Sequence, residues 1–415
     1  MPKDASLLVT YDYGSLSPVR LAEAAEQNES DVVFVTTGSE HAREMTPALE
    51  MVGSVIDTTG FDDSEILEAL EPFKPSGIVT FSEGMIVPTA RLAHLLELPY
   101  HSLDDVGAIT RKDLQRRRLA EKGVESVRFH EVTRVEEIGA ALDRVGLPAI
   151  VKPTTGAASK HTVSVTTEAQ CADAVARILD GTASPPRTAI VEELLVGRPV
   201  DAPWGDYLAV DCVADGEEVR PLFVTSKFAL AEPYRERGGY GQASTVPQAE
   251  LTAAQDLACR AVGALGIRTG IADVELKLTP AGPRVIEVNG RLGGWVDDLA
   301  VRSATADPAD AAVRAALGRP PAPVDARSAD AVAFHYLVMP PVTAHRVREV
   351  REGLFALRER PEVERVTITT RPGASADWRD GTDGGVAAVL GTAATHDRLA
   401  DLVAEIECID WIDYD

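Results

Sequence analysis

The sequence predicts a multidomain protein of mixed α/β (α+β) class. Its 415 residues are enough for two or three domains at about 150 residues each. With 45% hydrophobic and 26% charged residues, the chain can bury a core of ordinary size. Strand-like and helix-like segments alternate over the first hundred residues. From about residue 147 onward, by contrast, apolar runs are joined by short turns. This change of pattern indicates at least two kinds of sheet.

The first hundred residues predict a parallel sheet covered by helices. Helix-like stretches cover residues 18–26 and 86–96. Apolar runs separated by helices are typical of strands that are buried on both faces. The first strand ends in Tyr-Asp-Tyr-Gly-Ser, which is not the glycine-rich dinucleotide fingerprint, so we expect a Rossmann-like domain without its own cofactor. The predicted strands cover residues 6–13, 31–37, 52–58 and 77–81.

The middle of the chain predicts a largely antiparallel sheet. A basic helix covers residues 111–122, and Gly123 supplies a signal for its C-terminal end. The strands that follow are close together and leave room for few helices. They cover residues 149–152, 188–195, 207–214, 219–228, 272–278 and 284–288.

The last part of the chain predicts a small C-terminal α/β lobe. Residues 318–330 are rich in proline and alanine, as linkers are. Residues 396–409 form an amphipathic pattern, which predicts a final helix. Strands are expected at residues 332–339, 366–370 and 386–390.

The charge of the chain argues against two classes of partner. Lys and Arg number 41 against 65 Asp and Glu, a formal net charge of −24. Such a charge repels nucleic-acid backbones and anionic lipid, so we expect neither a nucleic acid nor a membrane as a partner. No run of about 18 apolar residues is present, and the first residues lack the basic and apolar regions of a secretory signal. We therefore expect a cytoplasmic protein.

The four cysteines are scattered and show no metal-ligand spacing. They are Cys171, Cys212, Cys259 and Cys408. In a reducing cytoplasm we expect them to be buried, small apolar residues, with a disulfide pair as the alternative.

The sharpest chemical pattern lies between residues 270 and 295. Two strands joined by a tight turn place Glu275 beside Glu287 if the strands pair across it. Residues two apart in a strand share a face, so Glu287, Asn289 and Arg291 point the same way. Two carboxylates and an amide oxygen are ligands that suit Mg²⁺ bound together with phosphates. Arg291 can then hold a phosphoryl group or a developing oxyanion. The alternative is a solvated, charged hairpin face.

A second pattern joins an apolar strand to a loop of small residues. Lys152 ends the strand, and Gly156, Ser159 and Lys160 lie in the loop. Small residues allow backbone N–H groups to approach phosphate oxygens. We expect Lys152 to act as a point charge toward phosphate rather than through packing, because only eight of the basic residues are lysines. On composition alone, an ordinary surface loop is nearly as good an interpretation.

Two weaker patterns complete the set. The strand that ends at Glu192 and Glu193 can offer its backbone to a purine edge, although two solvated acids at a strand end explain it equally well. Lys112 and Arg116 are four residues apart and share a helix face. Taken alone, that pair is more typical of a solvated basic face.

The order of these pieces resembles the ATP-grasp superfamily. Within it, the spacing is similar to that of carboxylate–amine ligases, which include the L-amino-acid (dipeptide) ligases. Residues 79–83, 92–99 and 291–295 add to the resemblance, which covers residues 75–320 best. It implies an ATP-grasp fold with four parts. These are a Rossmann-like pre-ATP-grasp domain (1–105), an N-terminal grasp subdomain (106–190), a C-terminal grasp subdomain with the metal site (191–320) and a C-terminal lobe (331–415).

The resemblance also implies a role for each matching residue. Arg291 is the implied catalytic residue, stabilising an acyl phosphate and the tetrahedral oxyanion. ATP is the implied nucleotide, with two Mg²⁺ ions for which Mn²⁺ can substitute. The implied phosphate contacts are Lys112, Lys152, Ser159 and Lys160. The implied adenine hinge is Glu192, Glu193, Leu194 and Leu195. The implied metal ligands are Glu275, Glu287 and Asn289, and the implied substrate-pocket residues are Glu236 and Trp295, with packing of the lobe interface as the alternative role of Trp295.

Three positions depart from the pattern of the family. Pro199 stands where many relatives have a glutamate that holds the ribose. Asp273 stands where many have a histidine, two residues before the first metal glutamate. Gly239 replaces the histidine of a Glu-x-Gly-His element that begins here at Glu236. That element usually contributes to the amino-acid pocket, so the identity of the substrates is open.

The expected activity is that of an ADP-forming ligase with a small-molecule carboxylate and an amine as substrates, both amino-acid-like. Two alternatives remain. One is a carboxylase-type ATP-grasp enzyme, although the loop at 154–160 has one glycine rather than the glycine cluster of the biotin-dependent enzymes. The other is a non-catalytic nucleotide-binding module. A homodimer is the expected assembly to be tested.

Overall fold

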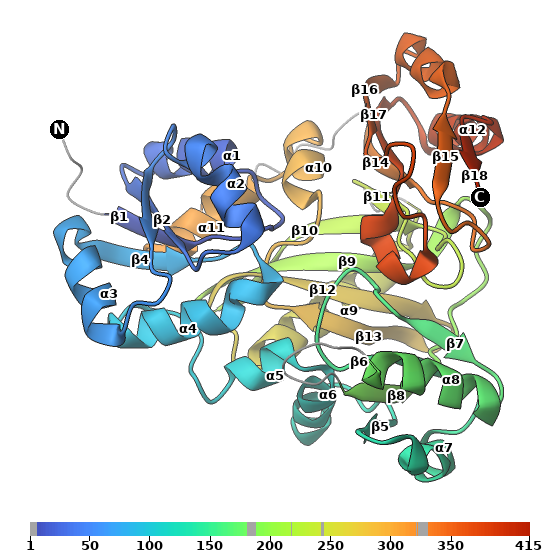
Figure 1. The fold of residues 1–415 in the computed structure, drawn as a ribbon, viewed down its shortest axis with the longest axis horizontal. Helices are drawn as coiled ribbons and strands as arrows, with labels where there is room; N and C mark the ends of the chain where they lie inside the picture. Colours follow the sequence, from blue (N-terminus) through green and yellow to red (C-terminus); the bar gives the residue numbers. More distant parts are fainter. Residues whose placement is uncertain (1–5, 181–187, 217, 242–244, 321, 323–330) are drawn as a thin grey trace.

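A computed structural model describes residues 6–180, 188–216, 218–241, 245–320, 322 and 331–415. The strands form two four-stranded sheets, one eight-stranded sheet and one two-stranded sheet. In Figure 1 the N-terminal sheet (blue), the small antiparallel sheet (green) and the C-terminal strands (orange to red) surround the long strands of the large sheet. The mixed α/β class predicted from the sequence is confirmed.

The N-terminal part is a parallel sheet with helices between its strands, as predicted. The strand order is β3-β2-β1-β4, and every neighbouring pair is parallel. The strands are β1 (Ser6–Thr10), β2 (Asp31–Thr36), β3 (Ser54–Asp57) and β4 (Pro75–Val79). The helices are α1 (Pro18–Gln27), α2 (Glu40–Leu49), α3 (Asp63–Leu70) and α4 (Ile86–Leu95).

A second, antiparallel sheet has the order β5-β8-β6-β7. Two strands predicted for the large antiparallel sheet belong here instead. The residue pattern of a strand predicts the strand itself but not the strand with which it pairs. That pairing depends on how the connecting segments fold, and here the connecting segments include helices. The strands are β5 (Phe129–Val132), β6 (Ala149–Pro153), β7 (Val163–Val165) and β8 (Ala189–Glu193). Helices α7 (Ile138–Val145) and α8 (Glu168–Leu179) contact this sheet, and α5 (Val106–Thr110) and α6 (Lys112–Glu121) precede it.

The large sheet has eight antiparallel strands in the order β13-β12-β9-β10-β11-β14-β17-β16. It runs without a break from the middle of the chain into the last 85 residues, because the short strand β11 pairs with both β10 and β14. The strands are β9 (Trp204–Asp215), β10 (Val219–Phe228), β11 (Gly238–Tyr240), β12 (Thr269–Thr279), β13 (Gly282–Asn289), β14 (Val332–Val338), β16 (Val363–Ile368) and β17 (Ala387–Ala393).

The remaining elements complete the layers around the large sheet. Helix α11 packs against α1 and so joins the N-terminal part to the rest (Figure 1). The remaining helices and strands are α9 (Gln248–Ala264), α10 (Val296–Arg302), α11 (Pro308–Ala316), α12 (His396–Cys408), β15 (Val347–Val350) and β18 (Ile412–Tyr414). The short 3-10 helices are η1 (Glu71–Phe73), η2 (Glu83–Met85), η3 (Val135–Glu137), η4 (Glu352–Glu359) and η5 (Trp378–Gly384). Most of the predicted linker at 318–330 lies outside the described residues.

The two faces of the large sheet differ in character. On β9, Leu208, Val210 and Cys212 join the apolar cluster that includes α9. The alternate residues, among them Tyr207 and Asp211, point to the opposite face, because side chains alternate along a strand. The face away from α9 therefore carries the polar groups of the candidate site.

No helix in the described part of the chain is long and apolar enough to cross a membrane. All four cysteines are free; Cys171 and Cys212 are buried and Cys259 is partly buried. The expectation of burial is wrong for Cys408, which is exposed at the C-terminal end of α12.

Candidate active site

The hairpin of β12 and β13 brings the predicted carboxylates together. Glu275 pairs directly with Glu287, and Asp273 pairs with Asn289. The amide nitrogen of Asn289 donates to Asp273 Oδ2 over 3.1 Å, which leaves the amide oxygen available to a cation. The pairing that the sequence predicted for these two glutamates is confirmed.

Further buried acids surround Glu275. Asp211, on β9, faces Asp273 across the ladder and accepts a bond of 2.8 Å from the backbone N–H of Gly293. Burial and the neighbouring charges of Asp273 and Glu236 raise the pKa of Glu275 to about 8. Burial and Asp273 likewise raise the pKa of Asp211. Negative charge is thus in excess here, and a divalent cation would reduce the electrostatic cost.

The candidate ligands Glu275, Glu287 and Asn289 would fill only part of the coordination shell of Mg²⁺. Within the residues that the structure describes, no group of three or more His, Cys, Asp or Glu side chains is arranged to hold a metal ion. Two carboxylates and one amide oxygen leave several of the six magnesium positions to water or phosphate oxygens. That is the usual manner in which magnesium binds with a nucleotide.

Helix α6 is fastened to β13 at the edge of the large sheet. The side chain of Gln115 donates to the carbonyl of Val288 and accepts from its N–H, both over 2.8 Å. The Arg116 guanidinium donates to the carbonyl oxygens of Val285 (2.9 Å) and Ile286 (2.5 Å). These side chains satisfy the backbone groups that an edge strand leaves unpaired. The first turn of α6 is therefore held beside the hairpin of β12 and β13.

Lys112 connects three parts of the site. Its ammonium lies 2.7 Å from Glu287 and donates to the carbonyl of Gly156 over 2.7 Å. Its own N–H donates to the carbonyl of Thr154 over 2.8 Å. Burial alone would raise the pKa of Glu287, but the charges of Lys112 and Lys152 outweigh burial and lower it.

Lys152 lies on β6 and faces Glu192 on β8. The ion pair measures 3.0 Å, and Arg116 also binds Glu192 through two contacts of 2.8 and 3.2 Å. Burial opposes ionisation of Glu192, yet these two cations lower its pKa to about 2. All three side chains are buried. The solvated interpretations of the Lys112–Arg116 face and of Glu192 are therefore wrong.

The other predicted hinge residues lie at the end of β8. Glu193 is partly buried and accepts from Arg128 over 2.6 Å and from Arg284 over 3.4 Å. Leu194 and Leu195 follow the strand and are partly buried. Glu193, Leu194 and Leu195 directly follow Glu192, the residue that pairs with Lys152, in the sequence.

The small-residue loop has an unusual backbone. Ala158, Ser159 and His161 have φ values of 61°, 54° and 56°, a region that residues other than glycine rarely adopt. Lys160 is exposed, and its ammonium lies 2.8 Å from Asp383, in η5. The predicted loop residues are therefore held by the last part of the chain.

Arg291 lies between the hairpin of β12 and β13 and the N-terminal part. Its guanidinium is 3.3 Å from Glu83, at the start of η2, and 3.8 Å from Asp273. It also donates to the carbonyl of Leu292 over 3.0 Å. Burial raises the pKa of Glu83 above its ordinary value, and the charge of Arg291 opposes that rise.

Glu236 and Trp295 lie farther along the same face of the sheet. Glu236 forms an ion pair with the buried ammonium of Lys227. Trp295 stacks on His335 with 4.8 Å between ring centroids, and His335 pairs with Gly239 in the ladder. Trp295 also packs against a small apolar cluster. A packing role for Trp295 is thus present in the structure.

Sequence reasoning assigned no role to Glu83, Asp211 and Lys227. Lys227 carried a usable signal, because it is one of only eight lysines and lies in an apolar strand. Asp211 carried a similar signal, because it is the one acid between Tyr207 and Ala214 of β9. Glu83 belonged to a segment that supported the resemblance, but only the tertiary structure brings it to Arg291.

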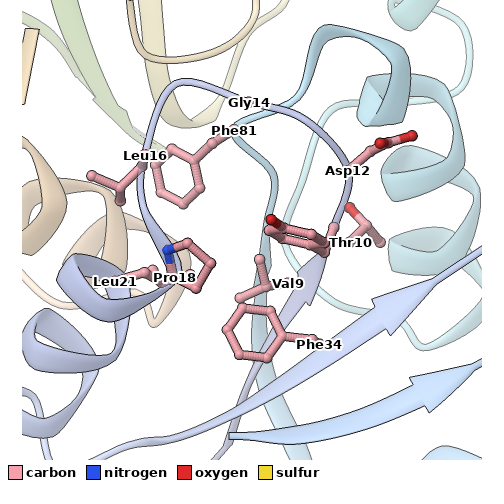
Figure 2. A pocket seen from close by; sticks show the side chains of 10 residues that line it. Val9, Thr10, Asp12, Gly14, Leu16, Pro18, Leu21, Phe34 and Phe81 are labelled. Carbon is pink, nitrogen blue, oxygen red and sulfur yellow. The ribbon is translucent and has the colours of Figure 1, made fainter. Parts of the chain in front are cut away.

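Two cavities lie outside the carboxylate hairpin. Figure 2 shows the first, where Leu16, Leu21, Phe34 and Phe81 point toward one another beyond the end of β1. The second measures ≈ 280 Å³ and is lined by Arg198, Pro199 and residues of β9 to β11. None of the predicted site residues lines either cavity.

Known proteins share part of this sequence and its fold. Residues 145–298 match the family model described as an ATP-grasp domain. The chain is 25% identical to alanine–anticapsin ligase of Bacillus subtilis over 249 residues, which cover 56% of this chain and 51% of that protein.

Two solved structures share the fold over almost the whole chain. The L-amino acid ligase from Bacillus licheniformis has a TM-score of 0.77 at 20% identity, covering 100% of this chain and 99% of that one. N5-carboxyaminoimidazole ribonucleotide synthetase from Thermus thermophilus has a TM-score of 0.69 at 17% identity and covers 99% of both chains.

The matched part spans about half the length of the first curated relatives. The family match falls on the segment that contains Lys152, the hinge and the carboxylate hairpin. The whole-chain likeness adds the N-terminal sheet and the C-terminal strands. Residues 145–298 therefore match an ATP-grasp domain, and the chain resembles the carboxylate–amine ligases of the L-amino-acid ligase type.

Proposed function

We propose that this protein is an ADP-forming ligase that joins a small carboxylate to an amine through an acyl phosphate. The observation that carries the proposal is the pairing of Glu275 with Glu287 directly beside Lys112, with Arg291 on the same side. Anion-binding and cation-binding side chains thus converge on one patch. ATP with Mg²⁺ supplies charges of both signs, as such a patch requires.

In this proposal, nucleotide binding exchanges one set of ion pairs for another. Lys112 and Lys152 are bound to Glu287 and Glu192 in the structure. Lys112 and Lys152 would turn to the phosphates, and Ser159 and Lys160 would reach them from the loop. Glu275, Glu287 and Asn289 would hold Mg²⁺, which when bound neutralises charge on the β- and γ-phosphate oxygens.

The reaction then has two steps. A carboxylate oxygen of the acid attacks the γ-phosphorus of ATP, the bond to the bridging oxygen breaks, and ADP leaves. The amine nitrogen next attacks the carbonyl carbon, the bond from that carbon to the phosphate oxygen breaks, and phosphate leaves as the nitrogen loses a proton. Arg291 places a fixed charge where the oxyanion forms, an effect of about 3 kcal/mol for a single oxyanion-hole donor.

Amino-acid-like substrates are the best-supported class. Their charged ammonium and carboxylate groups suit the face that carries Glu83, Lys227 and Glu236. The similarity to alanine–anticapsin ligase and to an L-amino acid ligase supports the same class. A screen of amino-acid pairs for ATP-dependent phosphate release, with mass spectrometry of the product, tests it directly. Absence of any amide product across the screen would contradict this assignment.

A carboxylase-type reaction is the second candidate. The whole-chain similarity to N5-carboxyaminoimidazole ribonucleotide synthetase favours it. Phosphate release that depends on bicarbonate instead of an amine would identify it. Binding of nucleotide without any turnover would instead indicate a non-catalytic module. A cytoplasmic location and a homodimer stay predictions, to be tested by fractionation and by light scattering.

A further inference from the structure

A short C-terminal segment reaches back to the small-residue loop. We call residues 381–383, which lie in η5, the latch segment, and residues 154–160 the phosphate loop. The backbone N–H of Thr382 donates to the carbonyl of Ala158 over 2.8 Å. The carboxylate of Asp383 lies 2.8 Å from the ammonium of Lys160. About 220 residues of chain separate the two segments, so this contact is a product of the tertiary fold.

Gly381 makes the approach possible. A Cβ atom at this position would lie 2.0 Å from the carbonyl oxygen of Ala158 and 2.8 Å from the N–H nitrogen of Lys160. Both neighbours are backbone atoms that cannot turn away as a side chain can. Its φ of +65° is also one that favours glycine. Any larger residue would push the latch segment off the phosphate loop.

The same segment also contacts the predicted substrate element. The hydroxyl of Thr382 accepts from the N–H of Glu236 over 3.2 Å. Glu236 in turn pairs with Lys227 on β10. Thr382 is buried and therefore connects the phosphate loop on one side with the Glu236 element on the other.

We propose that the latch segment is a positioning element that fixes the phosphate loop and the Glu236 element relative to each other before nucleotide binds. The loop of small residues adopts positive φ at Ala158, Ser159 and His161. Ordering such a backbone costs conformational entropy. A loop that is already held in place binds its ligand without meeting that cost at the moment of binding. The proposal rests on the proposed function in one respect, namely that this loop binds phosphate.

The first test compares two glycine variants within η5. Gly381→Ala should release the phosphate loop, whereas Gly384→Ala is the matched control, because its Cβ would meet no atom closer than 3.3 Å. Hydrogen exchange of peptides covering 154–162 should quicken in Gly381→Ala alone. The dissociation constant for MgADP, measured by calorimetry, should rise about tenfold, a change of about 1.4 kcal/mol. The control should stay within about twofold of the wild type.

A second variant guards against misfolding of the first. Asp383→Lys adds no strain to the backbone, and it replaces an attraction to Lys160 by a repulsion. It should quicken exchange in the same loop peptides while the melting temperature remains that of the wild type. The proposal is overturned if both variants leave exchange at 154–162 unchanged. Tighter binding of MgADP by Gly381→Ala would also overturn it, because the latch would then oppose binding.

A third variant tests the contact between the latch segment and Glu236. Thr382→Val keeps the N–H that bonds Ala158 and removes the hydroxyl that accepts from Glu236. Exchange should quicken in a peptide covering 232–240 and stay unchanged at 154–162. Quickened exchange across the whole C-terminal lobe would instead indicate a general structural role and contradict the proposal. Neither hydrogen exchange nor MgADP binding requires turnover, so both test the latch segment whether or not the protein is a ligase. A wild-type protein that forms no amide product would contradict the ligase assignment alone.

Discussion

Lys112 and Glu287 form an ion pair of 2.7 Å that joins helix α6 to strand β13. Lys112 is a candidate to bind phosphate, and Glu287 is a candidate to bind magnesium. Without a nucleotide they are each other's counter-ions. The chain therefore keeps two partly buried charges paired at a site where the proposed function requires both to change partners.

Glu287→Gln should keep the fold and abolish magnesium-dependent turnover. A neutral amide cannot offset the charge of a metal, although Lys112 retains its bond to the carbonyl of Gly156. The measurement is ADP formation over a range of magnesium concentrations, with circular dichroism as the control of folding. ADP formation at nearly the wild-type rate would remove Glu287 from the metal site.

Lys152→Met should weaken nucleotide binding and also lower the melting temperature. The sequence alone suggested a point charge whose loss would leave stability unchanged. The structure revises this expectation, because Lys152 is buried and lies 3.0 Å from Glu192. Removal of one partner from a buried pair costs about 3 kcal/mol.

The matched control for Lys152→Met is Lys122→Met, at an exposed lysine that ends α6. Calorimetry gives both the melting temperature and the affinity for MgADP. Unchanged affinity in Lys152→Met, with lowered stability, would make Lys152 a structural residue only.

The leaving nucleotide should be ADP, with phosphate as the second product. The carboxylate hairpin and the lysines suit transfer of the γ-phosphoryl group. Chromatography of the nucleotides during turnover decides the matter. Accumulation of AMP and pyrophosphate would replace the acyl-phosphate step by adenylation.

Arg291→Ala should reduce amide formation about a hundredfold or more, the scale of one oxyanion donor. Both the acyl phosphate and the oxyanion carry more charge in the transition state than the bound acid does. The loss should therefore appear in kcat rather than in ATP affinity. Arg291→Lys should recover little, because an ammonium cannot grip two oxygens as a planar guanidinium does. A fully active lysine variant would exclude this role.

Glu192→Gln should lower stability at neutral pH and lose its effect in acid. The folded-state pKa of Glu192 is lowered to about 2, against about 4.3 in an unfolded chain. Its ionised form thus stabilises the fold above pH 4.3, by about 3 kcal/mol, and this contribution disappears as the pH falls toward 2. Urea unfolding of both proteins between pH 3 and 6 should show a gap that narrows in acid. A gap independent of pH would contradict the assigned pKa.

The sequence by itself determined most of the local elements and the presence of the hairpin that carries Glu275 and Glu287. The sequence predicted that Glu275 lies beside Glu287, but the register that the turn sets would place Glu275 opposite Ile286. A β-bulge between Glu275 and Leu276 shifts the register by one residue and brings Glu287 opposite Glu275. The apolar runs likewise predicted most strands, and the Lys152 strand with its small-residue loop carried the resemblance that the fold confirms.

Only the tertiary structure decided which distant charges meet. Glu83 reaches Arg291 from the N-terminal part, and Asp383 reaches Lys160 from the last part of the chain. No spacing in the chain encodes these pairs, because they depend on how separate layers pack. Burial also turned Lys152 and Glu192 from apparent surface charges into a buried pair, since solvent exposure is a property of the assembled layers and not of a strand's own pattern.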